Sequence, residues 1–280
     1  MNVKFRTMGW ALLIGILLLF STAAADAQEE KTLMMATTTS TDNTGLLDYL
    51  APMFKAATGI DLKWTATGTG KALKLGENCD VDILMVHAPA AEKQFVSDGF
   101  GMERKEIMYN DFVIIGPPAD PAGIDGKPLK EAFEAIRESQ AVFTSRGDNS
   151  GTHKTELSLW EAAEMAVPEK ESWYVQTGQG MLTTINIAAE RGGYTMTDRG
   201  TYIKYEDNMK GNPPLRILVE GDKALLNQYS VIAVNPSNCP NVKTDLAQSF
   251  IDWATGEEAQ KAIADFKLLG KQLFTPNAAK

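Results

Sequence analysis

The sequence has few of the residues that metal and disulfide chemistry need. Its 280 residues include two cysteines and two histidines. Cys79, Cys239, His87 and His153 match no spacing of a structural zinc site, which excludes a zinc module of that kind. In an oxidising compartment the two cysteines allow one disulfide, and the sequence alone does not show whether their sulfurs meet.

Positive charge and long apolar runs are scarce as well. The chain has 27 Lys and Arg against 36 Asp and Glu, a formal net charge of −9. An acidic surface argues against nucleic acid and anionic membranes as partners. Beyond the N-terminal stretch, no apolar run reaches the ~18 residues that a transmembrane helix needs.

The N-terminal stretch has the three parts of a secretory signal peptide. Lys4 and Arg6 give a positive start, an apolar run follows, and Ala25-Asp26-Ala27 is a cleavage signal. We expect removal of residues 1–27, a mature start at Gln28 and free diffusion in the periplasm, since no cysteine follows the run to carry a lipid. This removal takes away two positive charges and one negative charge, so the net charge moves from −9 to −10. An uncleaved signal anchor is the alternative.

Apolar segments of strand length alternate with segments of helical period. Two consecutive strands each end in a polar loop that opens a helix, the βαβ pattern of a parallel sheet. Thr255 and Glu258 predict a capping box for the last helix. The predicted strands cover residues 31–36, 60–64, 81–86, 112–115, 141–144 and 229–234, and the clearest helices cover residues 46–57, 71–75 and 153–165.

Five hydroxyl residues, Thr37-Thr38-Thr39-Ser40-Thr41, follow the first predicted strand. Such side chains compete for backbone groups and disfavour a helix interior. At a helix N-terminus they would add neutral donors to the free N–H groups and the positive end of the dipole, which suits an oxyanion. One N-cap with solvated neighbours is the alternative interpretation.

A second loop, Gly68-Thr69-Gly70-Lys71, has part of a nucleotide-binding pattern. A Walker A motif needs Gly where Thr65 stands and Ser or Thr where Ala72 stands, so that interpretation fails. We interpret the segment as another strand-to-helix loop that offers Thr69 and backbone N–H groups to a ligand.

The segment of residues 145–152 is the strongest candidate for a ligand loop. Arg146 offers a planar fork to two oxyanion oxygens, and Asp148 can hold that fork in place. Ser150 and Thr152 flank Gly151, where the backbone can approach a ligand. A surface turn with an Arg–Asp pair is the alternative.

Arg146-x-Asp148-x-Ser150-Gly151-Thr152 resembles the anion loop of periplasmic phosphate-binding proteins. The sequence as a whole is more similar to the tungstate-binding proteins of bacterial ABC importers. Four segments carry that resemblance in chain order: residues 37–41, 86–89, 145–153 and 195–201.

The resemblance implies an α/β fold of the type II periplasmic binding proteins. Each of two lobes is then a mixed, mostly parallel sheet flanked by helices, with the ligand in the interlobe cleft. Because strand 229–234 and the last helix follow a long excursion, we expect residues 28–110 and 230–280 in lobe one and residues 111–229 in lobe two.

The resemblance also implies capture of tungstate, with molybdate as an alternative, for delivery to the permease subunits of an ABC transporter. We expect a monomer and a dianion held without a metal or a cofactor. Three helix N-termini, after Ala36, Thr65 and Thr144, would converge on it, with Arg146 as the one cation among their loops. The predicted ligand-binding residues are Thr38, Thr39, Ser40, Thr69, Arg146, Ser150, Gly151, Thr152 and Thr197.

Two further alternatives depend on the histidines. Phosphate keeps a proton at neutral pH, and phosphate-binding proteins place an Asp where His87 stands, so an unprotonated oxyanion (tungstate, molybdate or sulfate) is favoured. A secreted hydrolase of phosphate or sulfate esters would need an activated nucleophile or a metal cluster. No Gly-x-Ser-x-Gly elbow is present, so we do not expect an enzyme. We interpret His87 as a satisfied loop residue, His153 as an exposed first-turn residue, and Asp198 and Arg199 as an ion pair.

Overall fold

A computed structural model of the chain describes Met1 and residues 31–278. The predicted signal peptide and the mature start at Gln28 therefore lie outside the described residues. Within residues 31–278, every helix is too short or too polar to cross a membrane.

Ten strands join in one mixed sheet, in the order β2-β1-β3-β9-β4-β7-β5-β6, with β8 and β12 also paired to β4. The β1, β2 and β3 strands are mutually parallel, as are β5, β6 and β7, whereas β9 and β4 run antiparallel to their neighbours. The strands are β1 Thr32–Thr38, β2 Asp61–Thr67, β3 Ile83–Val86, β4 Gly101–Gly116, β5 Phe143–Ser145, β6 Tyr174–Gln176, β7 Tyr194–Asp198, β8 Arg216–Val219, β9 Leu226–Val234 and β12 Thr275–Pro276, with a separate pair of β10 Lys267–Leu268 and β11 Lys271–Gln272.

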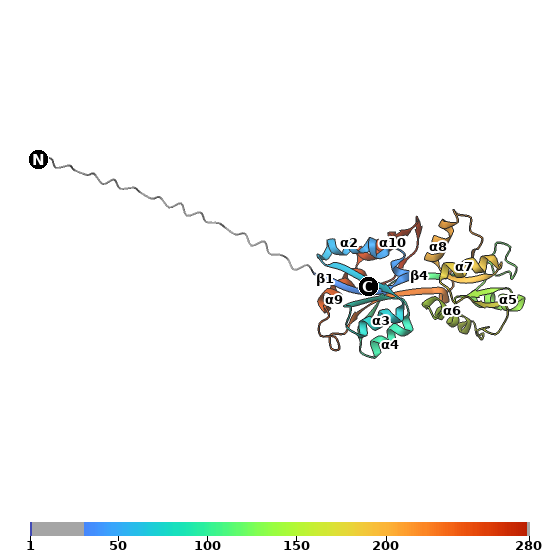
Figure 1. Ribbon diagram of the computed structural model, residues 1–280, viewed down its shortest axis with the longest axis horizontal. Coiled ribbons are helices and arrows are strands. Elements are labelled where there is room, and N and C mark those ends of the chain that lie inside the picture. Colours follow the sequence, from blue (N-terminus) through green and yellow to red (C-terminus); the bar gives the residue numbers. More distant parts are fainter. Residues whose placement is uncertain (2–30, 279–280) are drawn as a thin grey trace. The chain divides into compact units, whose positions relative to one another are not determined.

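Helices cover both faces of this sheet (Figure 1). Near β1, helices α2 and α10 lie on one face and α3 and α4 on the other; at the far end of β4, α7 and α8 lie opposite α5 and α6. The helices are α1 Thr39–Asp42, α2 Leu46–Thr58, α3 Thr69–Glu77, α4 Pro89–Ser97, α5 Leu129–Ser139, α6 Gly151–Ala162, α7 Met181–Glu190, α8 Arg199–Asn208, α9 Thr244–Thr255 and α10 Glu257–Asp265.

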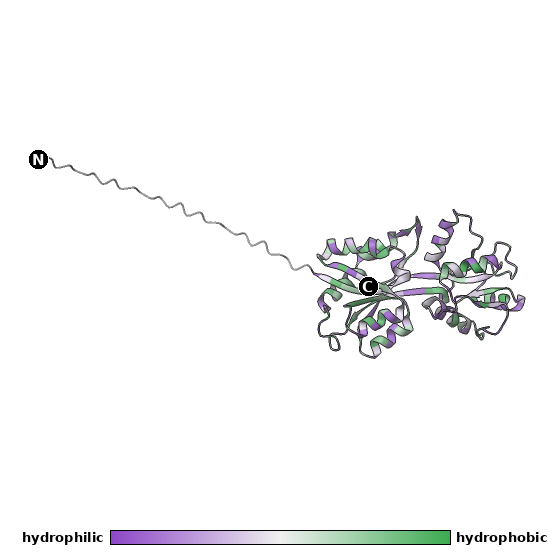
Figure 2. Cartoon of the chain, in the orientation of Figure 1, coloured by the Kyte–Doolittle hydropathy of each residue, from purple (hydrophilic) through white to green (hydrophobic). Residues whose placement is uncertain are grey.

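The apolar side chains of the described residues form four clusters. Two of them draw on residues 33–108 and 229–274, with Ile203 added, and together we call them the first core. The other two draw on residues 112–225, and together we call them the second core. Strand residues alternate between the two faces, so Phe112 and Ile114 face α5 and α6 while their neighbours face α7 and α8. The helices accordingly carry hydrophobic and hydrophilic residues in stripes (Figure 2).

The β4 strand joins the two cores. Its first part, to Asp111, pairs with β9, and its last residues from Phe112 pair with β7 and β8. The prediction of a strand that begins at residue 112 was too short by the whole first part. The charged run Glu103-Arg104-Lys105-Glu106 has no alternation of apolar and polar residues, so no strand signal is present there in the sequence. In the structure Arg104 forms an ion pair with buried Glu92 at 2.6 Å.

Short strands and one cap also differ from the predictions. The strands β6, β7 and β8 were not predicted, since three to five residues give little periodicity. The predicted capping box is wrong: Thr255 ends α9 and its hydroxyl donates to the Ile251 carbonyl at 2.8 Å, while Gly256 caps α10.

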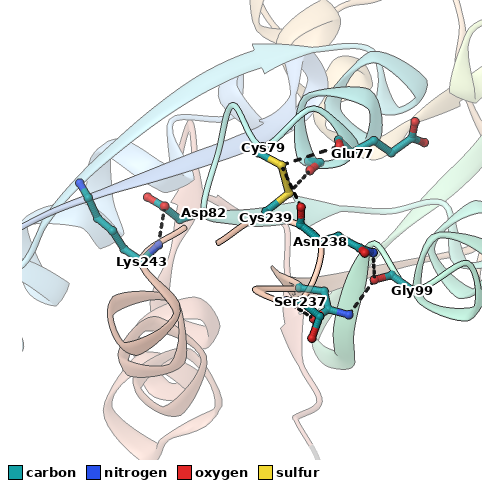
Figure 3. The surroundings of a disulfide bond; sticks show 10 residues. Glu77, Cys79, Asp82, Gly99, Ser237, Asn238, Cys239 and Lys243 are labelled. Atoms are coloured by element: carbon teal, nitrogen blue, oxygen red, sulfur yellow. Dashed lines mark hydrogen bonds between the residues drawn. A yellow bond between two sulfur atoms is a disulfide. The ribbon is translucent and has the colours of Figure 1, made fainter. Parts of the chain in front are cut away.

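The two cysteines form a disulfide, which the sequence left open. Cys79 follows α3 and Cys239 follows β9, with their Cα atoms 5.4 Å apart across 160 residues of sequence. Beside the bond, Asn238 donates to the Gly99 carbonyl at 2.8 Å (Figure 3). The disulfide therefore ties together the two sequence segments that share the first core.

Candidate ligand-binding site

A cleft of about 690 Å³ lies among the described residues, and both polar and apolar side chains form its wall. Elements around both cores contribute to it, and the N-terminal turns of α1, α6, α7 and α8 open into it. The lining residues are Thr39, Ser40, Asn43, Thr44, Arg146, Thr152, Gly180, Met181, Leu182, Thr183, Asp198, Gly200, Thr201, Lys204 and Leu268.

The hydroxyl run enters the cleft at a turn of helix directly after β1. The buried Thr38 is the N-cap of α1, and its Oγ1 accepts a hydrogen bond from the Thr41 N–H at 3.2 Å. Thr39 and Ser40 are exposed and line the cleft. Thr38 therefore serves as the cap, while Thr39 and Ser40 are left with side chains on the cleft wall.

Arg146 projects from the loop between β5 and α6. Its Nη2 donates to Asp148 Oδ2 at 2.5 Å, the contact that the sequence predicted. Gly147 has a φ of +59°, and a Cβ there would lie 2.7 Å from Gln176 Cβ, so the loop requires glycine. Ser150 caps α6 by accepting from the His153 N–H at 3.2 Å.

Hydrogen bonds keep Asp148 charged as a partner for this arginine. Its Oδ1 also accepts the Ser150 N–H at 3.1 Å. Burial acts to raise the pKa of Asp148, but the hydrogen bonds from Ser150 and Arg146 outweigh burial and lower that pKa. The guanidinium is therefore held in one orientation while its Nε, which is buried, has no hydrogen-bond partner among the described residues.

A buried glutamate packs beneath the loop that carries Arg146 and bonds to the residue before that arginine. Glu156 of α6 accepts hydrogen bonds from Ser145 Oγ at 2.5 Å, Tyr174 OH at 2.7 Å and Trp160 Nε1 at 3.1 Å. Burial raises the pKa of Glu156 despite these bonds. Through Glu156, the side chain of Ser145, which precedes Arg146, is thus connected to Tyr174 of β6 and Trp160 of α6.

The prediction missed two helix N-termini in the cleft. The first turn of α7 contributes Gly180, Met181 and Thr183, and α8 contributes Gly200 and Thr201. Gly180 caps α7 without a side chain, which leaves backbone N–H groups of that turn open. The glycines just before residue 181 were a signal for a loop that opens a helix. The signal was missed because the strand before this loop, β6, has only three residues and was not predicted.

A second cation, Lys204 of α8, lines the cleft outside the three loops in which Arg146 was expected to be the one cation. It lies three residues after Thr201 on α8, hence on the same helix face, and its Nζ donates to the Asn43 carbonyl. A helical projection of the segment after Thr197 would have found it.

The structure does not bring all the predicted ligand-binding residues to the cleft wall. Thr39, Ser40, Arg146 and Thr152 line it. Thr38, Thr69, Ser150, Gly151 and Thr197 do not, and the N-terminus of α3 after Thr65, one of the three helix ends expected to converge, is likewise not on the wall. Thr197 is fully buried, with its hydroxyl directed to the Asp198 carbonyl at 3.2 Å.

Three other side-chain interpretations can be compared with the structure. His153 is buried, not exposed, and its Nδ1 accepts the Asn149 N–H at 3.1 Å. Asp198 and Arg199 are not an ion pair: Asp198 caps α8 through Thr201, whereas Arg199 pairs with Asp111 at 2.5 Å. The structure gives the satisfied environment expected of His87, which bonds through both ring nitrogens.

Hydroxyls, helix N-termini and two cations make the cleft suited to a small anion. No group of three or more His, Cys, Asp or Glu side chains within residues 31–278 is placed to hold a metal ion. Asp198, which also lines the cleft, accepts hydrogen bonds from the Thr201 N–H at 2.9 Å and the Thr201 hydroxyl at 2.7 Å, one to each carboxylate oxygen.

Comparisons with known proteins agree with this geometry. Residues 22–258 match the PBP superfamily domain. The tungstate-binding protein TupA of Campylobacter jejuni is 54% identical over 239 residues, 85% of this chain and 88% of the relative. The structure of the tungstate-binding protein TupA from Desulfovibrio alaskensis G20 is 70% identical and superposes with a TM-score of 0.87, covering 89% of this chain and all of that one.

A third relative, described as the tungstate ABC transporter from Geobacter sulfurreducens, is 48% identical with a TM-score of 0.73, covering 84% of this chain and 98% of that one. All three relatives are named for binding or transport rather than for a reaction. The chain therefore belongs to the PBP superfamily and, within it, to the family of the tungstate-binding proteins.

Proposed function

We propose that this protein captures tungstate as a tetrahedral dianion in the cleft and delivers it to the permease of an ABC transporter. The observation that carries the proposal is the Arg146 guanidinium, held at the cleft wall by Asp148 with its buried Nε unpartnered among the described residues. A buried donor without an acceptor is unfavourable, and an oxyanion oxygen would supply the acceptor.

Neutral donors would complete the coordination. Thr39, Ser40 and Thr152 present hydroxyls at the same wall, and the first turn of α7 presents backbone N–H groups. Lys204 adds a second positive charge. Two cations and partial charges at helix ends balance a dianion without a resident metal.

We also propose that each core is one lobe, residues 28–110 and 230–280 in lobe one and residues 111–229 in lobe two. The β4 and β9 strands would then act as the hinge on which the lobes close over the anion. The separation of the apolar clusters supports this division. Figure 2 shows hydrophilic residues where these two strands cross between the cores, as expected of a hinge without a core of its own.

We favour an anion without protons, because a protonated phosphate needs an acceptor and this chain has His87 where phosphate-binding proteins place an Asp. Tungstate is preferred to molybdate and sulfate because the relatives are named for it.

Calorimetric titration with tungstate, molybdate, sulfate and phosphate at equal ionic strength tests the function. We expect one tungstate per chain, bound at least tenfold more tightly than sulfate and phosphate. Periplasmic material from the native host serves as the control for processing, and mass spectrometry should find a chain that begins at Gln28. If the titrations show no heat of binding for any of the four anions, the proposed function is refuted.

A further inference from the structure

His87 connects the cleft to the strands that join the two cores. Its Nε2 lies 3.0 Å from Thr38 Oγ1 and 3.1 Å from Ser40 Oγ, and these two hydroxyl oxygens are 3.0 Å apart. Its Nδ1 lies 3.0 Å from Asn227 Oδ1 on β9. The ring stacks on Tyr229, with centroids 4.6 Å apart.

The partners of Asn227 determine which ring nitrogen carries the hydrogen. Asn227 Nδ2 donates to Asn110 Oδ1 of β4 at 2.7 Å, so its Oδ1 faces the imidazole. A carbonyl oxygen only accepts, and Nδ1 of His87 must therefore donate. In the neutral ring Nε2 is left as a pure acceptor that faces the hydroxyls of Thr38 and Ser40.

Each hydroxyl has one hydrogen to give. Thr38 is buried, and its Oγ1 contacts the N–H and, at 2.6 Å, the hydroxyl of Thr41, whereas Ser40 is exposed at the cleft wall. While Nε2 is unprotonated, its one lone pair competes with a bound anion for the hydrogen of the Ser40 hydroxyl. If Nε2 gains a proton it donates instead, and the Ser40 hydrogen is free to point into the cleft.

We propose that His87 is a positioning residue that takes up a proton when the cleft binds its anion, and thereby turns the Ser40 hydroxyl into a donor to that anion. This inference rests on the proposed function. By linkage, affinity for the anion then rises as pH falls through the range in which His87 titrates, with a limit of about one log unit per pH unit.

The surroundings of His87 suit such a change. Burial lowers its pKa below the ordinary value, while the Asn227 hydrogen bond and the carboxylates of Glu92 and Asp198 act in the opposite direction. Glu92 is paired with Arg104, and Asp198 is engaged by Thr201. The free ring is thus neutral at pH 7, and a dianion in the cleft would raise its pKa toward that range.

Calorimetry with micromolar tungstate in two buffers of different ionisation enthalpy measures the protons taken up. At about pH 6.5, near the ordinary histidine pKa, we expect uptake of a substantial fraction of one proton per anion. His87→Gln keeps a polar side chain that does not titrate and should show no uptake, whereas His153→Gln should retain it. Equal uptake in wild type and His87→Gln would overturn the proposal.

Two further measurements cover a His87→Gln chain that folds poorly. With two histidines in the sequence, a nitrogen-15 spectrum of the imidazoles should show the Nδ1–H tautomer for His87 and the Nε2–H tautomer for His153. The opposite tautomer at His87 would contradict the proposal. Asn227→Asp, which puts a carboxylate against Nδ1–H, should move the pH range of proton uptake upward. An unchanged pH range in this variant would contradict the proposal.

The outcomes separate this inference from the proposed function. Tungstate binding without proton uptake keeps the function and removes the role of His87. Failure of the wild-type chain to bind any oxyanion removes both.

Discussion

Arg146 combines three constraints in one side chain. Asp148 holds one end of the guanidinium, Gly147 sets the backbone direction, and Glu156 anchors the preceding Ser145. A planar group held in this way can meet two oxygens of one tetrahedral anion, which a flexible lysine cannot.

Arg146→Lys should therefore weaken tungstate binding by about tenfold and reduce discrimination among oxyanions. Arg146→Glu should remove detectable binding, because a carboxylate at the wall repels a dianion. Arg216→Lys is the matched control: Arg216 pairs with Asp125 outside the cleft, and its replacement should leave the affinity unchanged. Near-normal affinity of Arg146→Glu in calorimetry would show that the anion binds elsewhere.

At the scale of elements, α2 shows how burial can outweigh local preference. Pro52 lies inside this 13-residue helix, where it has no N–H for the Asp48 carbonyl. The helix nevertheless continues to Thr58, because Leu46, Leu50 and Phe54 are buried along one face in the first core. The helix that this periodicity predicted over residues 46–57 is confirmed by the structure.

Pro52→Ala should stabilise the protein by ~2 kcal/mol, since it restores the helical hydrogen bond and loses only a small unfolded-state advantage. Urea denaturation measures the change. Pro118→Ala is the control of opposite sign: Pro118 lies in a turn after β4, and its loss should lower stability by ~0.5 kcal/mol. If the Pro52→Ala protein is no more stable than wild type, the helix accommodates the proline ring without a cost in stability.

At the scale of the whole molecule, the first core depends on segments far apart in the sequence. Residues 33–108 and 229–274 build it together, and the disulfide between Cys79 and Cys239 closes a loop across 160 residues. The intervening residues form the second core. The disulfide thus restrains the unfolded chain strongly while it lies away from the cleft.

Replacement of both cysteines by serine should lower the free energy of unfolding by about 2–5 kcal/mol, because the loop lost is long. Tungstate affinity of the folded protein should stay within about twofold, since neither cysteine lines the cleft. Denaturation and calorimetry on one preparation measure both quantities. A large loss of affinity at full folding would show that the disulfide shapes the site.

By itself, the sequence determined the α/β class, the alternation of strands and helices near the N-terminus, and the loop around Arg146. These features have local causes: apolar periodicity, hydroxyl and glycine runs that open helices, and an Arg–Asp pair two residues apart. The same local signals identified Thr39, Ser40 and Thr152, which line the cleft.

Only the tertiary structure decided which helix ends meet. It excluded Thr69 and Thr197 from the cleft wall and added Lys204 and the first turn of α7. It also joined Cys79 to Cys239 and placed His87 against Asn227. These contacts depend on the packing of segments more than a hundred residues apart, where the geometry of the sheet, rather than any local preference, sets the distance between side chains.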